Sequence, residues 1–225
     1  MGSKAGRRRT KYSVASLLLA LLVGVGAWWT QQDGASTPVS VAEQDGQKAV
    51  DSAGLADARV LLEQLHVAEE DTGYRYDRDD WPHWASQGQG CNTREVALRE
   101  QGQNVRVDDE CRAVEGTWRS DYDGVVVQNA SDADLDHLVP LAEAARSGAR
   151  GWTREQRRDF ANDLDQLIVV TATSNRQKGD QDPASWLPER GRCGYVTRWI
   201  QVKTSYRLSV DPDEYQSLAA VLSRC

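Results

Sequence analysis

Apolar residues recur in different patterns along the chain, and each pattern predicts a different kind of element. Between Leu55 and Leu65 they recur at the spacing of one helix face, which predicts a helix at the start of the folded region. From Leu167 to Thr171 every residue is apolar or β-branched, which predicts a short strand over residues 166–171. A longer apolar run, Val14 to Trp29, stands near the N-terminus. The chain therefore combines helices, strands and a terminal apolar segment.

Capping and turn residues mark the remaining elements. Asn92 or Thr93 can cap a helix, because either side chain can accept a hydrogen bond from the first turn. Thr153, followed by Gln156, predicts the start of a second helix that extends to Leu164. Residues 116–127 read as two strands around an Asp-Gly turn. Three further helices are predicted over residues 174–179, 199–208 and 212–222.

The N-terminal segment has the features of an export signal. Basic residues precede the apolar run, and Val25-Gly26-Ala27 offers a small-residue cleavage site, which favours a cleaved signal peptide. The run also approaches the ~17–25 residues of a spanning helix, and Trp28 and Trp29 suit the edge of a membrane, so an uncleaved anchor is the alternative. In either case we expect the rest of the chain to be secreted or anchored at the extracellular face. The predicted segments are 1–30 (signal or anchor), 31–54 (flexible linker) and 55–225 (folded domain).

The cysteines agree with export. Four cysteines in an exported chain predict two disulfides, for which three pairings exist. We predict Cys91–Cys111 and Cys193–Cys225, because each pair closes a moderate loop within one region. No two cysteines have the C-x-x-C spacing of a metal site.

Charge limits the kind of nucleic-acid contact that is plausible. The formal net charge of −7 disfavours a protein that coats nucleic acid by bulk charge. Residues 135–210 are the exception, with 12 Lys/Arg against 9 Asp/Glu. This region is therefore the less repulsive one for a polyanion.

The same region holds the residues best suited to chemistry. Asp136 and His137 end an apolar segment, and Asn175 follows the predicted strand. A histidine that titrates near neutrality can act as general base, and carboxylate and amide oxygens are hard ligands for Mg²⁺. Neighbours on a strand point to opposite faces, so Asp136 and His137 serve one site only if the strand ends or bulges there. Pro140 just downstream makes such an end plausible.

Basic residues beside Asn175 complete the predicted site. Hydrolysis of a phosphodiester needs an attacking water, a base and positive charge on the phosphate oxygens. Arg176 and Lys178 could hold the scissile or a flanking phosphate, and a helix that starts at Asn175 would add the pull of its N-terminus. The set as a whole predicts metal-assisted cleavage of a phosphodiester, with His137 as base.

These motifs resemble the HNH endonucleases of the ββα-metal superfamily. The chain is more similar still to exported HNH proteins related to the C-terminal nuclease domain of modification-dependent restriction enzymes. The resemblance implies an α+β fold, a ββα-metal core that clasps one divalent ion, and DNA cleavage. The resemblance implies that Asp136 and Asn175 are metal ligands and that His137 is the general base. It also implies that Arg94 binds phosphate or organises the site. The matching stretches are residues 76–84, 90–95, 134–144, 160–164 and 174–186.

The chain also departs from the family pattern. Gln166 stands where the family has an Asn at the strand entry, which leaves the role of that position open. A helical insertion over about 142–164 separates the two halves of the hairpin, and further helices flank the core. Asn175 in place of a histidine argues against a two-histidine zinc site. The expected cofactor is one divalent ion, Mg²⁺ or alternatively Mn²⁺.

The sequence features are compatible with three functions. The first is an exported, metal-dependent DNA endonuclease, with DNA as its partner and membrane association through the N-terminal helix if that helix is retained. The second is a noncatalytic, surface-anchored binding module on a nuclease scaffold, which the acidic net charge favours. The third is a phosphodiesterase that acts on RNA or on small substrates. No protein partner is inferred.

Overall fold

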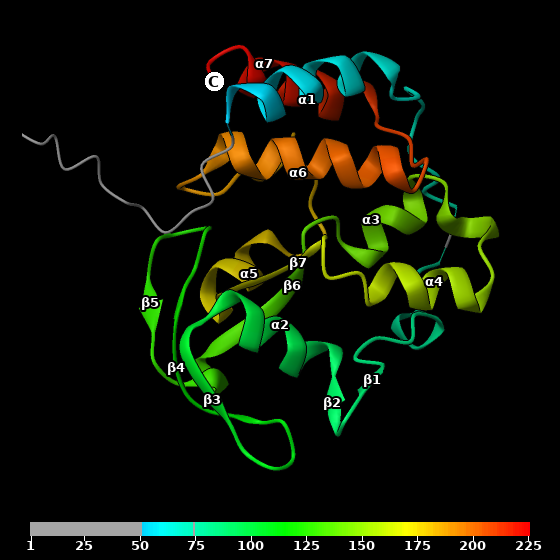
Figure 1. Cartoon of the computed structure of the whole chain (residues 1–225). Coiled ribbons are helices and arrows are strands. Elements are labelled where there is room, and N and C mark those ends of the chain that lie inside the picture. The colour runs from blue at the N-terminus through cyan, green and yellow to red at the C-terminus, as the bar shows by residue number, and fades with distance from the viewer. Residues whose placement is uncertain (1–50, 74) are drawn as a thin grey trace, which may run out of the picture. The chain divides into compact units, whose positions relative to one another are not determined.

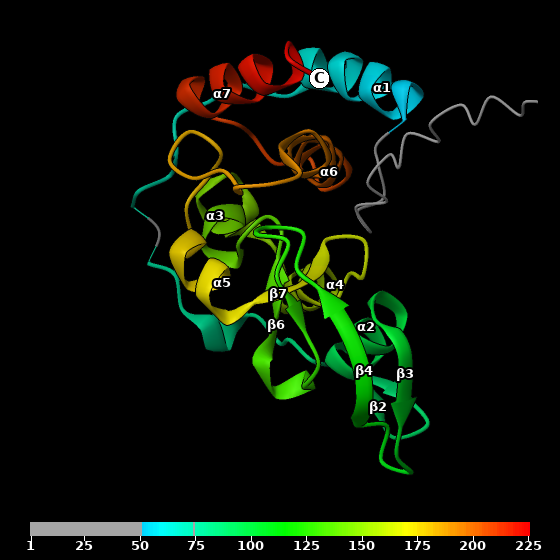
Figure 2. The same ribbon diagram turned by 90° about the vertical axis from the view of Figure 1, so that its left-hand side faces the viewer.

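Helices from both ends of the described chain pack together. The computed structural model describes residues 51–73 and 75–225, and in it α1 (Ser52–Gln64) and α7 (Pro212–Leu222) lie side by side across α6 (Arg192–Ser205) (Figures 1 and 2). The buried faces of these helices join the largest core cluster. The predicted first helix is confirmed, although it begins at Ser52, within the segment predicted as linker. The helix expected from Trp199 begins earlier, at Arg192.

An antiparallel hairpin lies below this helical layer. Strand β6 (Ala133–His137) pairs with β7 (Leu167–Thr171) in unbroken register, from Ala133 opposite Thr171 to His137 opposite Leu167. All of β7 is buried, as its apolar sequence predicts. Helix α5 follows β7 directly, and the insertion between the strands is helical. These elements are α5 (Ala172–Lys178), α3 (Leu141–Arg146), η3 (Ala149–Gly151) and α4 (Arg154–Ala161).

A second, smaller layer flanks the hairpin on its other side (Figure 2). Helix α2 (Thr93–Gln101) is capped by the Asn92 side chain, as predicted, and a capping box of Thr153 and Gln156 starts α4. The predicted pair of strands around the Asp-Gly turn is present as β4 and β5. The elements of this layer are β1 (Ser86–Gly88), β2 (Cys91–Asn92), β3 (Gln103–Val107), β4 (Ala113–Arg119) and β5 (Val126–Val127), with single turns η1 (Arg78–Asp80) and η2 (Ala130–Asp132).

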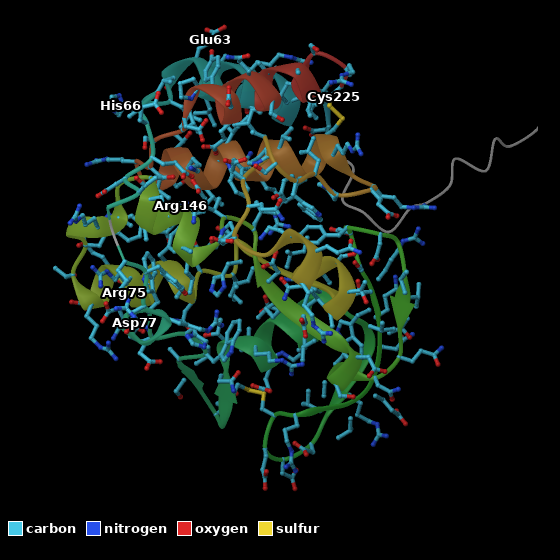
Figure 3. The ribbon with its side chains drawn as sticks, turned by 180° about the vertical axis from the view of Figure 1, so that it is seen from behind. Glu63, His66, Arg75, Asp77, Arg146 and Cys225 are labelled. Carbon is cyan, nitrogen blue, oxygen red and sulfur yellow. A yellow bond between two sulfur atoms is a disulfide. The ribbon has the colours of Figure 1, made fainter. Side chains whose placement is uncertain are left out.

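Both predicted disulfides are confirmed. Cys91–Cys111 joins the start of α2 to the loop before β4, and Cys193–Cys225 pins the C-terminus to α6. The second bond is visible beside the Cys225 label in Figure 3. The α+β class is confirmed as well. The predicted signal, residues 1–30, and most of the predicted linker lie outside the described residues. Within residues 51–73 and 75–225, every helix is too short or too polar to cross a bilayer.

A buried ion cluster ties α3, α6 and α7 together. The Lys203 ammonium on α6 lies 2.6 Å from Glu143 Oε1 and 3.2 Å from Glu214 Oε2, and all three side chains are almost fully buried. One cation therefore serves two carboxylates. Burial alone would raise the pKa of Glu143, but Lys203 outweighs burial and lowers this pKa to about 2. Burial raises the pKa of Glu214 to about 7, although Lys203 opposes this. Of the two carboxyl groups, that of Glu214 is thus the weaker acid.

This arrangement predicts a pH-dependent stability. The pKa of Glu214 is higher in the folded chain than in the unfolded chain, so its contribution is complete below about pH 4.5 and is lost as the pH rises to about 7. The loss should approach about 3 kcal/mol, at 1.36 kcal/mol per pKa unit. Denaturant unfolding of Glu214→Gln between pH 4.5 and 8 should show a flatter profile than wild type. The exposed control Glu63→Gln should keep the wild-type profile; an unchanged profile for Glu214→Gln would contradict the assignment.

Candidate active site

His137 ends β6 with its imidazole buried and held on two sides. The ring nitrogen Nε2 lies 2.9 Å from the carbonyl oxygen of Ala161. Ala161 is the last residue of α4, so its carbonyl has no partner within the helix. Because a carbonyl only accepts hydrogen bonds, Nε2 carries the proton and Nδ1 carries the lone pair. The ring also stacks on Trp84, with centroids 5.6 Å apart and planes at 16°.

Burial also sets the charge of His137. It lowers the pKa of the imidazole to about 3, against the hydrogen bond to Ala161, which raises it. The positive charges of Lys178 and Arg78 lower the pKa further. The ring is therefore neutral at physiological pH, which leaves a lone pair to accept a proton, but its pKa does not lie near neutrality as the sequence motif predicts.

Asp136 precedes His137 but faces the other side of the hairpin. Strand β6 keeps its register to the last residue, without a bulge, so successive side chains point to opposite faces. The Asp136 carboxylate accepts a hydrogen bond from Tyr122 Oη at 2.7 Å and pairs with Lys178 Nζ at 2.8 Å. Burial raises the pKa of Asp136, while Lys178 and Tyr122 oppose the rise. The expected convergence of Asp136 and His137 is therefore not built into the strand, which simply ends at His137.

Asn175 contacts Asp134 rather than Asp136. Its Nδ2 donates to Asp134 Oδ2 at 3.1 Å. Asp134 and Asp136 are two residues apart on β6, so both face α5. With Nδ2 engaged, the amide oxygen of Asn175 is the group left for a cation. Helix α5 begins at Ala172, which places Asn175 in the second turn, so the predicted pull of the helix N-terminus does not act there.

The two predicted phosphate contacts divide between surface and interior. Arg176 is exposed on α5. Lys178 is fully buried, and its ammonium contacts the Asp136 carboxylate and, at 2.9 Å, the carbonyl oxygen of His137. Burial lowers the pKa of Lys178, and Asp136 opposes this. The charge of Lys178 is thus balanced inside the protein, where a substrate phosphate does not reach it.

Arg94 connects α2 to the segment that leads into β6. Its Nη2 donates to the carbonyl oxygens of Ala130 at 2.8 Å and Ala133 at 3.1 Å, and Nη1 lies 3.8 Å from Glu95. Of the two roles that the resemblance implies for Arg94, these contacts fit the site-organising one, because the guanidinium fixes the backbone at the start of the strand that carries His137.

Two side-chain amides hold the chain around His137. Gln166, which stands at the position of the family's Asn, is fully buried and donates from Nε2 to the Phe160 carbonyl at 2.5 Å. Asn162 was not predicted as a site residue, although it lies in a stretch that matches the family. It joins the end of α4 to the segment that carries Trp84. Its amide accepts from Ala85 N and Thr93 Oγ1 and donates to the carbonyls of Pro82 and Arg158.

The donor set on the α5 side fits a divalent ion in its chemistry. Asp134, Asp136 and Asn175 offer carboxylate and amide oxygens, the ligands that Mg²⁺ and Mn²⁺ prefer. Lys178 already balances the charge of Asp136. Among the described residues, no basic side chain lies within hydrogen-bond or ion-pair distance of Asp134. Asp134 therefore supplies a carboxylate whose charge is not balanced. Among those residues, three acidic side chains gather closely enough to share an ion elsewhere, at Glu70, Asp182 and Asp211.

Sequence comparison assigns the chain to a known family. A family model described as the C-terminal domain of GmrSD restriction endonucleases matches residues 93–221, which include β6, β7 and α5. A protein of Arthroderma benhamiae, described as an uncharacterized secreted protein, is 47% identical over 172 residues, covering 75% of this chain and 84% of that protein. No solved structure matches. The chain therefore belongs to the family of GmrSD restriction endonuclease C-terminal domains.

Proposed function

We propose that this chain is an exported, divalent-metal-dependent endonuclease that hydrolyses phosphodiester bonds of DNA. The observation that carries the proposal is the contact of His137 Nε2 with the Ala161 carbonyl, 2.9 Å away, which holds the ring proton on Nε2. That arrangement leaves Nδ1 as the atom that can take a proton from water. Membership of a restriction-endonuclease family and the relative described as secreted support the same conclusion.

Each residue of the site has a defined part in this proposal. His137 accepts the proton of the attacking water, and Trp84 and the Ala161 carbonyl fix the plane of its ring. Asp136 and Asn175, with Asp134 beside them, would hold one Mg²⁺ or Mn²⁺. When bound, this ion would supply the positive charge that phosphodiester cleavage needs. The exposed Arg176 would contact a phosphate of the DNA backbone.

The metal requirement is the first test. Purified residues 31–225, with both disulfides formed, should cut plasmid DNA in Mg²⁺ or Mn²⁺ and lose this activity with a chelator. Asn175→Ala should lower the rate about 10- to 100-fold at limiting metal, because the ion loses an oxygen ligand and its neighbours lose their orientation. Excess Mn²⁺ should recover part of that loss. Asp108→Asn, in the turn before β4, is the control. Full activity in the chelator would overturn the metal dependence.

A noncatalytic binding module is the alternative, and one observation favours it. The Lys178 ammonium already neutralises Asp136, so the site is partly balanced without a metal ion. This alternative expects no cleavage of plasmid, of RNA or of a small phosphodiester in any divalent metal. Cleavage of RNA or of the small substrate alone would instead identify a phosphodiesterase with a different substrate.

A further inference from the structure

Two neighbouring residues outside the hairpin and α5 contact both halves of the candidate metal site. Tyr122 and Asp123 lie in the turn between β4 and β5. Tyr122 Oη donates to Asp136 Oδ2 at 2.7 Å. Asp123 Oδ2 accepts from Thr171 Oγ1 at 2.5 Å and from Ser174 Oγ at 2.6 Å. One residue therefore holds β6, and the next holds the junction of β7 and α5.

The Asp123 contacts act at the start of the helix that carries Asn175. Thr171 caps α5 by accepting a hydrogen bond from the Ser174 backbone N–H, and Ser174 immediately precedes Asn175. The hydrogen bonds from Ser174, Thr171 and the Val125 backbone outweigh burial and lower the pKa of Asp123. Asp123 is thus a charged acceptor that fixes both hydroxyls, and with them the first turn of α5.

The turn that contains Tyr122 and Asp123 is held in place by its own hydrogen bonds and by packing, so it can hold the residues that it contacts. Gly124 N donates to the Ser120 carbonyl at 2.8 Å, and Val125 N donates to Asp123 Oδ1 at 3.0 Å. The Tyr122 ring is almost fully buried and packs edge-on against Trp186 and Tyr195. A flexible loop would adapt to movements of Asp136 and Asn175, whereas this one constrains them.

We propose that Tyr122 and Asp123 are positioning residues that set the distance between the Asp136 carboxylate and the Asn175 amide for a divalent ion. The inference rests on the proposed function. It assigns a role to two residues that lie outside the hairpin and α5. Partners that orient the ligands of a metal ion change its affinity about 10- to 100-fold when they are removed.

The test measures metal binding without activity. Calorimetric titration of Mn²⁺ into the chelator-treated domain should show affinities about 10- to 100-fold weaker for Tyr122→Phe and Asp123→Asn than for wild type. Tyr206→Phe is the matched control, because Tyr206 also loses a hydroxyl-to-carboxylate bond, to Asp163 at 2.8 Å, away from the site. Asp108→Asn is the control for Asp123→Asn. Both controls should bind Mn²⁺ as wild type does.

A second readout separates positioning from loss of structure. In plasmid cleavage, Tyr122→Phe and Asp123→Asn should need about 10- to 100-fold more Mn²⁺ for half-maximal rate, with the maximal rate largely recovered at saturation. A merely structural defect would lower the maximal rate without this recovery. Wild-type binding by both variants would overturn the positioning role and leave the proposed function intact. Absence of Mn²⁺ binding by the wild-type domain would overturn the proposed metal dependence, and the positioning role with it.

Discussion

Replacing His137 with glutamine should lower the rate of plasmid cleavage about 10²- to 10⁴-fold, the usual contribution of a general base. The amide of glutamine can donate to the Ala161 carbonyl as Nε2 of the imidazole does, but it cannot take a proton from water. His137→Ala should show a loss in the same range, and it also leaves a gap beside Trp84. Initial rates of supercoiled-plasmid nicking, at saturating Mn²⁺, measure the effect.

The control for this substitution is another histidine. His66 follows α1 in the helical layer, away from the hairpin (Figure 3), so His66→Gln should cut at the wild-type rate. Mn²⁺ affinity should be nearly unchanged in His137→Gln, because the His137 ring contacts the Ala161 carbonyl and Trp84 and is not one of the proposed ligands. Undiminished cutting by a correctly folded His137→Gln chain would refute the base assignment. A loss of Mn²⁺ affinity equal to the loss of rate would instead make His137 a ligand.

Replacing Lys178 with methionine should destabilise the folded domain by about 3–5 kcal/mol, the cost of leaving one partner of a buried ion pair alone. Lys178 is fully buried, and its ammonium contacts both the Asp136 carboxylate and the His137 carbonyl. Methionine fills similar volume but leaves Asp136 without a cation. Denaturant unfolding at pH 7 measures the loss, which should shrink at lower pH because an unpaired carboxylate takes up a proton.

The double variant Asp136→Asn/Lys178→Met is the matched control. Removing both charges should restore much of the stability, since the cost arises from the isolated carboxylate and not from the absence of the pair. A double-mutant cycle gives the coupling between the two residues directly. If Lys178→Met left stability unchanged and weakened only DNA binding, Lys178 would be a phosphate contact as its sequence motif predicts.

The sequence predicted the secondary structure and the cross-links well because these depend on local signals. The caps at Asn92 and Thr153 and the β-branched run before Thr171 each act within a few residues of themselves. Element boundaries were less certain. Helix α6 extends to Arg192 because its first turns complete the core around Tyr195, a contact that no local pattern reveals.

The sequence predicted the residues of the site, but the expected convergence of Asp136 and His137 is not built into the strand. The motif of Asp136, His137 and Asn175 was sufficient to identify the family, which the family model confirms. It could not show that Asn175 pairs with Asp134, or that Lys178 points inward, because these facts depend on how α5 packs against β6. Tyr122 and Asp123 carried no signal beyond an Asp-Gly turn, since their partners at the site, Asp136, Thr171 and Ser174, are 14, 48 and 51 residues away in sequence.

By itself, then, the sequence predicted most helices and strands from local patterns and both disulfides from loop length, and its motifs carried the resemblance that implied the α+β class. Only the tertiary structure decided which face of the hairpin each side chain occupies and which charge is balanced inside the protein. A strand alternates its side chains with a period of two, so neighbours in sequence such as Asp136 and His137 enter different surroundings. Burial then raised the pKa of Asp136 and lowered that of His137, and burial is a property of the packed chain.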